Sequence, residues 1–293
     1  MPMLVHTLLC EQHLWFAVPC LRSLIACSED PIRLVIHDDG SLTPVSVEEL
    51  TGAFPDAILV LRRSADAELA EALARFPHIA QARTHLPHVL KLMDTTMIHP
   101  EPIVRYVDTD VLFQKSFRGL FPISEPSVPG AFMMDSGNSF AAHPGDFWPL
   151  GPLRLPRQLN SGLFWIQRDC LDYERMEYLF KRWGAERIRR YHGWFEQTVW
   201  ADQAWRARLW MYDPGQFGTA SQDSSLNSRF TGVHYVTPSR NMLKAALESA
   251  PAGTVNAASG VCEEIRLCLP KPFGLFGAAL VVARSLAARP STG

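Results

Sequence analysis

Hydrophobic and polar residues follow two different periodic patterns along the first 115 residues of the chain. Short apolar runs rich in Val, Ile and Leu predict strands, and longer stretches with apolar residues three and four apart predict helices. The expected strands cover residues 4–9, 32–37, 57–61 and 103–107. The expected helices cover residues 11–28, 45–54, 64–76 and 78–97, with a kink at Pro19, a cap at Ser64 and a break near Pro87. Strands that alternate with helices indicate an α/β fold whose sheet is mixed, mostly parallel and flanked by helices.

The pattern changes after residue 115. Seven prolines between residues 122 and 156 indicate a stretch rich in loops. One expected strand, at 130–134, interrupts this stretch. Beyond it the pattern predicts strands at 163–167, 209–212 and 232–236, and helices at 169–183 and 197–208. Because strands resume after the loops, we expect a single domain over residues 1–260, followed by a tail at 261–293.

The tail combines apolar residues with Lys271, Arg284 and Arg289. This pattern is typical of an amphipathic helix, which would lie either on a membrane surface or against the domain. No apolar run in the chain reaches the roughly 18 residues of a membrane-spanning helix. The N-terminus also lacks the basic region and cleavage site of a signal peptide. We therefore expect a cytoplasmic protein, with peripheral membrane contact through the tail left open.

Composition excludes two broad classes of protein. A hydrophobic fraction of 47% and a charged fraction of 20% rule out a wholly disordered chain. The 28 basic and 30 acidic side chains give a net charge of −2, and the nearest approach to a basic cluster is Arg187, Arg189 and Arg190. We therefore do not expect nucleic acid as a partner. The six cysteines form neither a CxxC pair nor a zinc-like spacing, which predicts reduced, mostly buried thiols.

The segment with the clearest chemical signal contains Asp108 and Asp110, directly after the apolar run 103–107. In open α/β sheets, ligands bind at the carboxyl ends of the strands. Two carboxylates among apolar neighbours are costly unless a cation or hydrogen-bond donors compensate them. Carboxylate oxygens suit Mg²⁺ or Mn²⁺, particularly where substrate phosphates complete the shell. The alternative is a pair of turn-capping aspartates, or one aspartate paired with Arg105.

The Asp108-Thr109-Asp110 segment resembles the DxD motif of nucleotide-sugar-dependent glycosyltransferases of the GT-A fold. With the companions described below, the chain resembles the retaining galactosyltransferase and glycogenin-like family over residues 4–244, where only short segments match closely. The resemblance implies a GT-A-like fold and a UDP-sugar donor, with Mn²⁺ or Mg²⁺ held by the two aspartates. Residues 1–113 would bind the nucleotide, and residues 114–260 would supply the acceptor and catalytic groups. The acceptor, whether saccharide, lipid or protein, stays open.

The first companion is the pair Asp38 and Asp39, which precedes Gly40 at the end of an expected strand. It resembles the loop that binds the donor base and ribose in GT-A enzymes. A carboxylate at this position can accept a hydrogen bond from a uracil N–H or a ribose hydroxyl. The alternative is an ordinary Asp-Gly turn.

The second companion is the triplet Asn160, Ser161 and Gly162, which resembles the hydrophobic-Asn-(Ser/Ala)-Gly motif of the family. The resemblance implies that Asn160 contacts sugar hydroxyls, and that Ser161 and Gly162 let the donor approach the backbone. An Asn-Ser-Gly turn is the alternative.

The third companion is His234, which resembles the C-terminal histidine that completes the metal shell in the family. A histidine buried in the core is the alternative. The family often continues with Gly and Lys-Pro-Trp, whereas this chain has Thr-Pro-Ser-Arg at residues 237–240. Arg240 or Lys244 could nevertheless neutralise the charge of a diphosphate.

The sequence specifies the group that acts at the anomeric carbon less closely than it specifies the metal ligands. The related families place an acidic residue and a glutamine near the start of a late helix, which fits Glu196 and Gln197, with Asp202 and Gln203 as competitors. A glutamate at a helix start also has a structural explanation in the helix dipole. An inverting enzyme needs a carboxylate base, and a retaining enzyme needs a group that stabilises an oxocarbenium-like centre. The Asn160 and His234 similarities favour the retaining course.

Three rival functions share some of these features. A haloacid-dehalogenase-type phosphatase would use Asp108 as its nucleophile, but this chain has Leu112 where that family has Thr or Val. A sugar nucleotidyltransferase should carry a glycine-rich loop after the first strand, where this chain has Glu11-Gln12-His13. A non-catalytic module would keep the fold and bind a nucleotide-sugar without turnover.

Overall fold

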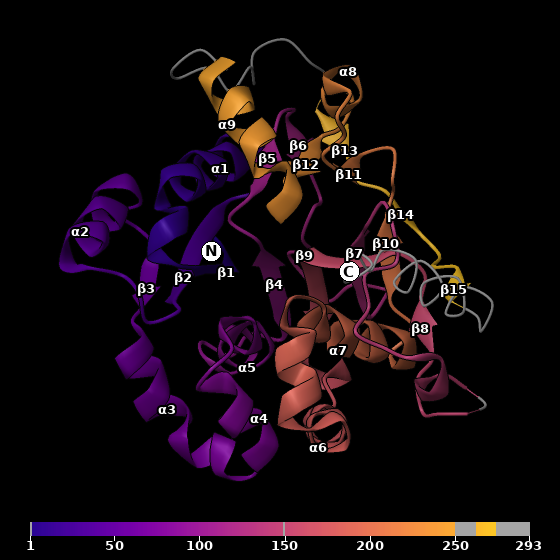
Figure 1. Cartoon of the computed structure of the whole chain (residues 1–293). Coiled ribbons are helices and arrows are strands. Elements are labelled where there is room, and N and C mark those ends of the chain that lie inside the picture. The colour runs from indigo at the N-terminus through magenta and orange to yellow at the C-terminus, as the bar shows by residue number, and fades with distance from the viewer. Residues whose placement is uncertain (1, 149, 250–261, 274–293) are drawn as a thin grey trace, which may run out of the picture.

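The computed structural model describes residues 2–148, 150–249 and 262–273, which form an α/β fold around one large sheet. The eight strands of this sheet lie in the order β14-β10-β7-β9-β4-β1-β2-β3 (Figure 1). In chain order they are β1 (Met3–Leu9), β2 (Ile32–Asp38), β3 (Ile58–Val60), β4 (Ile103–Val107), β7 (Gly130–Met134), β9 (Leu159–Gln167), β10 (Trp210–Tyr212) and β14 (Leu267–Cys268). Only β9 and β14 run antiparallel to the others in this sheet. The prediction of a mixed, mostly parallel sheet is confirmed.

Helices cover both faces of the sheet. They are α1 (Leu14–Cys27), α2 (Pro44–Ala53), α3 (Arg62–Ala74), α4 (Pro77–Arg83), α5 (Leu90–Met97), α6 (Tyr173–Arg190) and α7 (His192–Arg206). Two more helices, α8 (Ser224–Asn227) and α9 (Arg240–Ser249), lie beyond the large sheet (Figure 1). Successive strand residues point to opposite faces. In β2, Leu34 and Ile36 join the core cluster that contains α1, whereas Val35 joins the cluster that contains α3 to α7. Burial on both faces explains why these strands appear in the sequence as continuous apolar runs.

One predicted helix cap, one predicted helix end and one predicted helix start differ from the structure. Ser64 does not cap α3, since the helix begins at Arg62 and its N-cap residue is Leu61. The predicted helix 169–183 stops too early. Gly184 adopts a φ of +66° and kinks α6, and the helix continues beyond this kink to Arg190. Helix α7 begins at His192, so Glu196 lies beyond the first turn and the helix dipole does not explain it.

A small second sheet extends the molecule beyond the end of β4. It has the order β11-β12-β5 and consists of β5 (Val111–Phe113), β11 (Phe217–Thr219) and β12 (Gly232–His234). A separate core cluster packs β12 and α9 against α1 through Val233, Tyr235, Leu243 and Phe16. Since Val233 and Tyr235 face α1, the residue between them, His234, faces the opposite side.

Two further strand pairs involve the first part of the predicted tail. Strand β13 (Glu263–Glu264) pairs with β6 (Phe117–Arg118), and β15 (Pro272–Phe273) pairs with β8 (Leu155–Pro156). Residues 262–273 are thus strands and loops beside the domain, with β14 at the edge of the large sheet. The expected tail helix falls mainly on residues 274–293, which lie outside the described residues.

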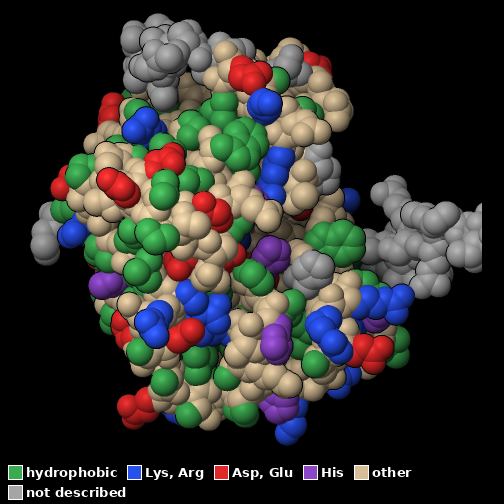
Figure 2. Space-filling model, turned by 60° about the vertical axis from the view of Figure 1, so that its left-hand side comes forward, with side chains coloured by type: hydrophobic (Ala, Val, Ile, Leu, Met, Phe, Trp, Pro, Cys, Tyr) green, Lys and Arg blue, Asp and Glu red, His purple; other side chains and the backbone are tan. Residues whose placement is uncertain are grey.

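Charge and thiols complete the description. On the face seen in Figure 2, Lys and Arg side chains are interspersed with Asp and Glu and do not gather into one basic patch. All six cysteines are free thiols. Within the described ranges, no helix has the length and apolar character needed to span a membrane.

Candidate metal and donor site

The Asp108–Asp110 turn lies at the carboxyl edge of the large sheet, between β4 and β5. Strand β9 runs antiparallel to β4, with Leu163 opposite Val107, so its first residues lie at the same edge. The main-chain N–H of Asp108 donates to the carbonyl of Gly162 at 2.7 Å. The sheet therefore brings the second companion motif against the DxD turn.

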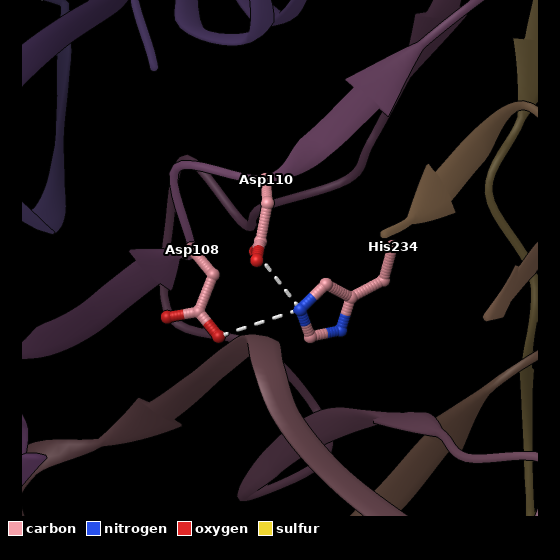
Figure 3. Close-up of side chains that lie close together, drawn as sticks. All are labelled: Asp108, Asp110 and His234. Carbon is pink, nitrogen blue, oxygen red and sulfur yellow. Dashed lines mark ion pairs between the residues drawn. The ribbon is translucent and has the colours of Figure 1, made fainter. Parts of the chain in front are cut away.

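His234 reaches the same turn from the small sheet. Strand β12 pairs antiparallel with β5 so that His234 lies opposite Val111. Figure 3 shows its Nε2 atom pointing toward both aspartates, 3.0 Å from Asp110 Oδ1 and 3.6 Å from Asp108 Oδ2. One ligand atom from each of the three side chains lies within 4.8 Å of the others. The sequence predicted this trio, and the structure brings its members together.

The electrostatics of the trio are set by its own contacts and by Arg240. Burial alone would raise the pKa of Asp110, but His234 and Arg240 outweigh it and bring the pKa to about 2. Burial alone would lower the pKa of His234, but Asp110 and Asp108 outweigh it and raise the pKa. Asp110 is thus charged and lies close to Asp108 and His234, and two carboxylates with one imidazole suit Mn²⁺ or Mg²⁺.

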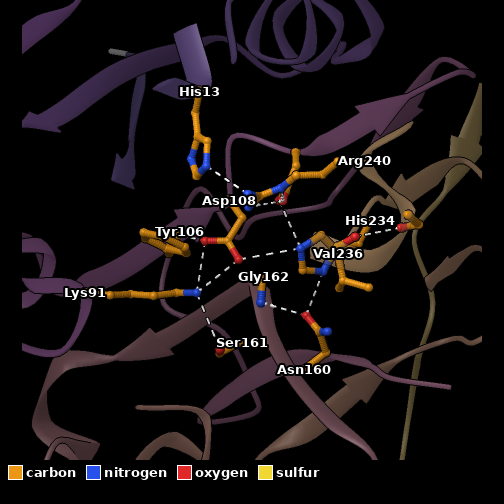
Figure 4. Close-up of polar contacts among 12 residues, drawn as sticks. His13, Lys91, Tyr106, Asp108, Asn160, Ser161, Gly162, His234, Val236 and Arg240 are labelled. Atoms are coloured by element: carbon orange, nitrogen blue, oxygen red, sulfur yellow. Dashed lines mark hydrogen bonds and ion pairs between the residues drawn. The ribbon is translucent and has the colours of Figure 1, made fainter. Parts of the chain in front are cut away.

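Arg240, the first residue of α9, closes one side of the site. Its Nη2 and Nε atoms donate to Asp110 Oδ2 at 3.1 and 3.3 Å, and Nη1 lies 2.8 Å from His13 Nε2 (Figure 4). His13 ends the short turn after β1, and burial together with the charge of Arg240 lowers its pKa. The sequence alone did not indicate His13 as a site residue, although its position after the first strand is where ligands bind in such folds.

Lys91 of α5 closes the other side and was also not selected. It is only 5% exposed, and its Nζ atom lies 3.0 and 3.2 Å from the oxygens of Asp108. Burial alone would lower the pKa of Lys91, but Asp108 and Glu196 outweigh it and raise the pKa. Tyr106 lies beneath it, with the ammonium 4.5 Å from the ring centroid, and donates from its hydroxyl to Asp108 Oδ1 at 2.7 Å. The signal in the sequence that could have identified Lys91 is a lysine within an apolar helical segment.

Glu196 joins this group from α7. Its Oε2 atom accepts from the Ser161 hydroxyl at 3.1 Å, and its Oε1 atom lies 3.7 Å from Lys91 Nζ. Oε1 is buried and has no hydrogen-bond partner. Burial raises the pKa of Glu196 to about 7, more than Lys91 lowers it. A buried carboxyl group with one oxygen that accepts no hydrogen bond thus lies beside the candidate metal ligands.

The competing acid and the glutamines have structural contacts elsewhere. Asp202 is held by Arg175 through two hydrogen bonds of 2.7 and 2.8 Å, and Gln203 contacts the main chain of Asp172. Gln197 donates to the carbonyl of Ser139 at 2.9 Å. Of the two candidate acids, Glu196 is therefore the one that lies beside the metal ligands.

The loop after β2 uses its first carboxylate to hold its own backbone. Asp38 accepts from the N–H groups of Gly40 and Leu42 at 2.7 and 3.2 Å, and from that of Arg62 at 3.2 Å. Asp39 accepts from the N–H and hydroxyl of Ser41 at 3.0 and 2.5 Å. These contacts fit the Asp-Gly turn alternative, and a base-and-ribose role for the loop stays a prediction.

Comparisons with known proteins place these observations in context. No protein-family model matches the chain, and no curated protein sequence does. Similar solved structures include the galactosyltransferase LgtC with donor and acceptor sugar analogues, at 14% identity and a TM-score of 0.49 over 80% of this chain and 88% of that one. Mouse xyloside xylosyltransferase 1 has 12% identity and a TM-score of 0.47, covering 81% of this chain and 99% of that one. The mannosyltransferase Ktr4p from S. cerevisiae has 12% identity and a TM-score of 0.44, covering 70% and 65%.

These three structures are glycosyltransferases, the class that the DxD segment resembles. A likeness of this degree does not by itself assign the chain to a family or an activity. The activity therefore has to be inferred from the residues of the site.

Proposed function

We propose that the chain is a metal-dependent glycosyltransferase that moves a sugar from a UDP-sugar to an acceptor hydroxyl. The observation that carries the proposal is the convergence of Asp108 Oδ2, Asp110 Oδ1 and His234 Nε2 at the carboxyl edge of the sheet. The resemblance of the DxD turn and its companions to GT-A enzymes supports the same activity.

The three side chains fit a divalent cation that also binds a diphosphate. Two carboxylate oxygens and one imidazole nitrogen leave positions for phosphate oxygens in a six-coordinate shell. Mn²⁺ or Mg²⁺, when bound, would supply positive charge to the departing diphosphate. Arg240 lies directly beside Asp110, and its planar guanidinium suits a phosphate group. It would exchange part of its contact with Asp110 for the diphosphate.

Glu196 is the group that we assign to the reacting sugar. Its pKa of about 7 lies near the optimum for proton transfer at neutral pH. In an inverting reaction its free Oε1 would take the proton of the acceptor hydroxyl. In a retaining reaction the carboxylate would face the positive charge that develops at the anomeric carbon. The resemblance of Asn160 and His234 to the retaining family favours the second course.

The same residue distinguishes the proposal from a module that only binds the donor. Burial raises the pKa of Glu196 to about 7, which suits proton transfer, and a protein that merely holds the donor makes no use of such a group. Glu196 therefore favours an enzyme. The phosphatase alternative fits poorly, because this chain has Leu112 where that family has Thr or Val.

Calorimetry tests the proposal directly. Wild type, Asp110→Asn and the surface control Asp223→Asn would be titrated with UDP-, GDP-, ADP- and dTDP-sugars, with and without Mn²⁺. We expect Mn²⁺-dependent binding of a UDP-sugar by wild type and the control. We expect Asp110→Asn to bind at least about 100-fold more weakly, since it loses a charged ligand. Absence of binding across the panel, or an unaffected Asp110→Asn variant, would overturn the proposal.

A further inference from the structure

Each of the three metal-facing atoms belongs to a side chain whose other polar atom is held by the protein. Asp108 Oδ1 accepts from Tyr106 and Lys91, and Asp110 Oδ2 accepts from Arg240. The outer atom of His234, Nδ1, lies 3.0 Å from Asn160 Oδ1 (Figure 4). Partners of this kind orient metal ligands and set their protonation. The partner of His234 is the informative one, because an imidazole can carry its proton on either nitrogen.

The orientation of the Asn160 amide is fixed by a main-chain group. Its Oδ1 atom accepts from the N–H of Gly162 at 2.8 Å, inside the buried start of β9. A main-chain N–H can only donate, so the atom that it faces must be the carbonyl oxygen of the amide. The same oxygen faces His234 Nδ1, and an oxygen of this type can only accept. Nδ1 of His234 must therefore carry a proton.

The close approach of the ring depends on a missing side chain. A Cβ atom at Gly162 would lie 2.5 Å from His234 Nδ1 and 2.9 Å from Asn160 Oδ1. Such distances do not occur between packed atoms, so glycine is what lets the imidazole reach the amide. Gly162 has no positive φ, and its role here is clearance rather than backbone freedom.

We propose that Asn160 is a positioning residue that holds the proton of His234 on Nδ1 and presents Nε2 as an unprotonated ligand to the cation. This deepens the proposed function and rests on it, since it assigns the side of His234 that meets the metal. The sequence resemblance implied that Asn160 contacts the sugar, whereas the structure commits its oxygen to His234 and Gly162.

Nitrogen NMR of the wild-type protein tests the proton position without any substrate. Protein labelled with ¹⁵N-histidine would be measured metal-free and with Mg²⁺, and the His234 signals assigned by their loss in His234→Gln. We expect Nδ1 to carry a proton in both samples, whether or not Nε2 is also protonated before the metal binds. An Nδ1 atom without a proton would overturn the proposal. This readout holds even if no nucleotide-sugar binds.

Metal affinity tests the consequence. Mn²⁺ binding would be titrated in the presence of UDP for wild type, Asn160→Leu, Asn160→Asp and the control Asn138→Leu. Asn138 also accepts from a main-chain N–H, that of Gln158, and lies on a separate loop. We expect Asn160→Leu to weaken Mn²⁺ binding about 10- to 100-fold, the usual cost of losing an outer-shell partner.

The conservative variant makes the result specific. Asn160→Asp keeps an acceptor for Nδ1, so we expect it to stay within about threefold of wild type, as should Asn138→Leu. Equal losses of Mn²⁺ affinity in Asn160→Leu and Asn160→Asp, or no loss in Asn160→Leu, would overturn the proposal. Either result would show that Asn160 does not act by accepting a hydrogen bond from His234 Nδ1. Failure of wild type to bind Mn²⁺ with UDP would instead count against the proposed function. Melting temperatures of each variant separate loss of binding from loss of fold.

Discussion

The loop after β2 and the turn after β4 each place two aspartates at the carboxyl edge of the same sheet, but their carboxylates have opposite surroundings. In the loop, Asp38 accepts from three main-chain N–H groups and the arrangement is complete without a ligand. In the turn, Asp108 and Asp110 lie beside an imidazole, and their donors are charged or phenolic side chains.

The contrast distinguishes carboxylates that hold a turn together from carboxylates that converge on a common point. Main-chain N–H groups stabilise a carboxylate and fix a turn, with no further charge required. Two carboxylates that converge with an imidazole on one point offer the ligand atoms that a divalent cation takes. The comparison predicts that substitutions in the turn and around it affect chemistry, whereas substitutions in the loop affect stability.

The largest expected effect is on turnover. Glu196→Gln removes the ionisable group next to the metal ligands while it preserves the shape of the side chain. We expect transfer to fall about 100- to 10,000-fold, the range for loss of a general acid or base. Donor binding should stay within a few-fold of wild type, and the exposed control Glu174→Gln should leave turnover unaffected. Steady-state rates with calorimetry of donor binding give both quantities. Full turnover in Glu196→Gln would remove this residue from the reaction.

The second prediction concerns stability against pH. The pKa of Glu196 is about 7 in the folded chain, against an ordinary value of 4.5. Between these values the folded state keeps a proton that the unfolded state has released, so stability falls as pH rises from about 4.5 to 7 and is constant above. The loss is at most about 3 kcal/mol. Denaturant unfolding of wild type and Glu196→Gln from pH 5 to 8 should show a smaller slope in the variant. Equal slopes would mean that the carboxyl is already ionised at pH 5.

The third prediction tests the clearance at Gly162. Gly162→Ala should destabilise the fold by about 1–3 kcal/mol, the usual cost of overpacking, because its methyl group would overlap the His234 ring. The same substitution in a His234→Ala background should cost less, since the ring is gone. Urea unfolding of the four proteins in this cycle measures the coupling. If Gly162→Ala costs the same with and without the ring, the close approach of His234 is not what requires glycine.

The smallest expected effect is in the loop. Asp38→Asn keeps one acceptor oxygen but replaces the other with an amide nitrogen that cannot accept from Arg62 N–H. We expect a stability loss of about 1 kcal/mol, typical of one hydrogen bond. Thermal unfolding measures this loss, and Leu61→Ala beside α3 serves as a control for the helix start. A loss of UDP-sugar binding beyond the stability effect would show that Asp38 also binds the donor, and the contrast between the two regions would then fail.

Part of the fold was predictable because local pattern and burial agree. The runs at 4–9, 32–37 and 103–107 match β1, β2 and β4 closely, since strands buried on both faces must be apolar throughout. Strand β9 was predicted from residue 163 but begins at Leu159. Its polar and small first residues resemble a turn in the sequence, and only their place beside β4 and β7 makes them a strand.

The residues of the site also divide into those that the sequence indicated and those that it did not. The aspartates were selected because carboxylates at the end of a strand suit a metal ion, and His234 and Glu196 because their positions along the chain resemble motifs of the GT-A enzymes. Lys91 and His13 were not, because a single lysine in a helix or a histidine after a strand looks the same whether it faces solvent or a carboxylate. Their contacts come from elements far apart in the sequence.

The sequence by itself determined β1 to β4 and the helices between them, and that a pair of aspartates follows the buried strand β4. The tertiary structure decided how the polar groups meet. The pairing of β12 with β5 turns His234 toward Asp110, and the antiparallel course of β9 brings Asn160 and Gly162 to His234. The physical reason is that local propensity acts over a few residues, whereas strand pairing and burial join residues that are far apart in the chain.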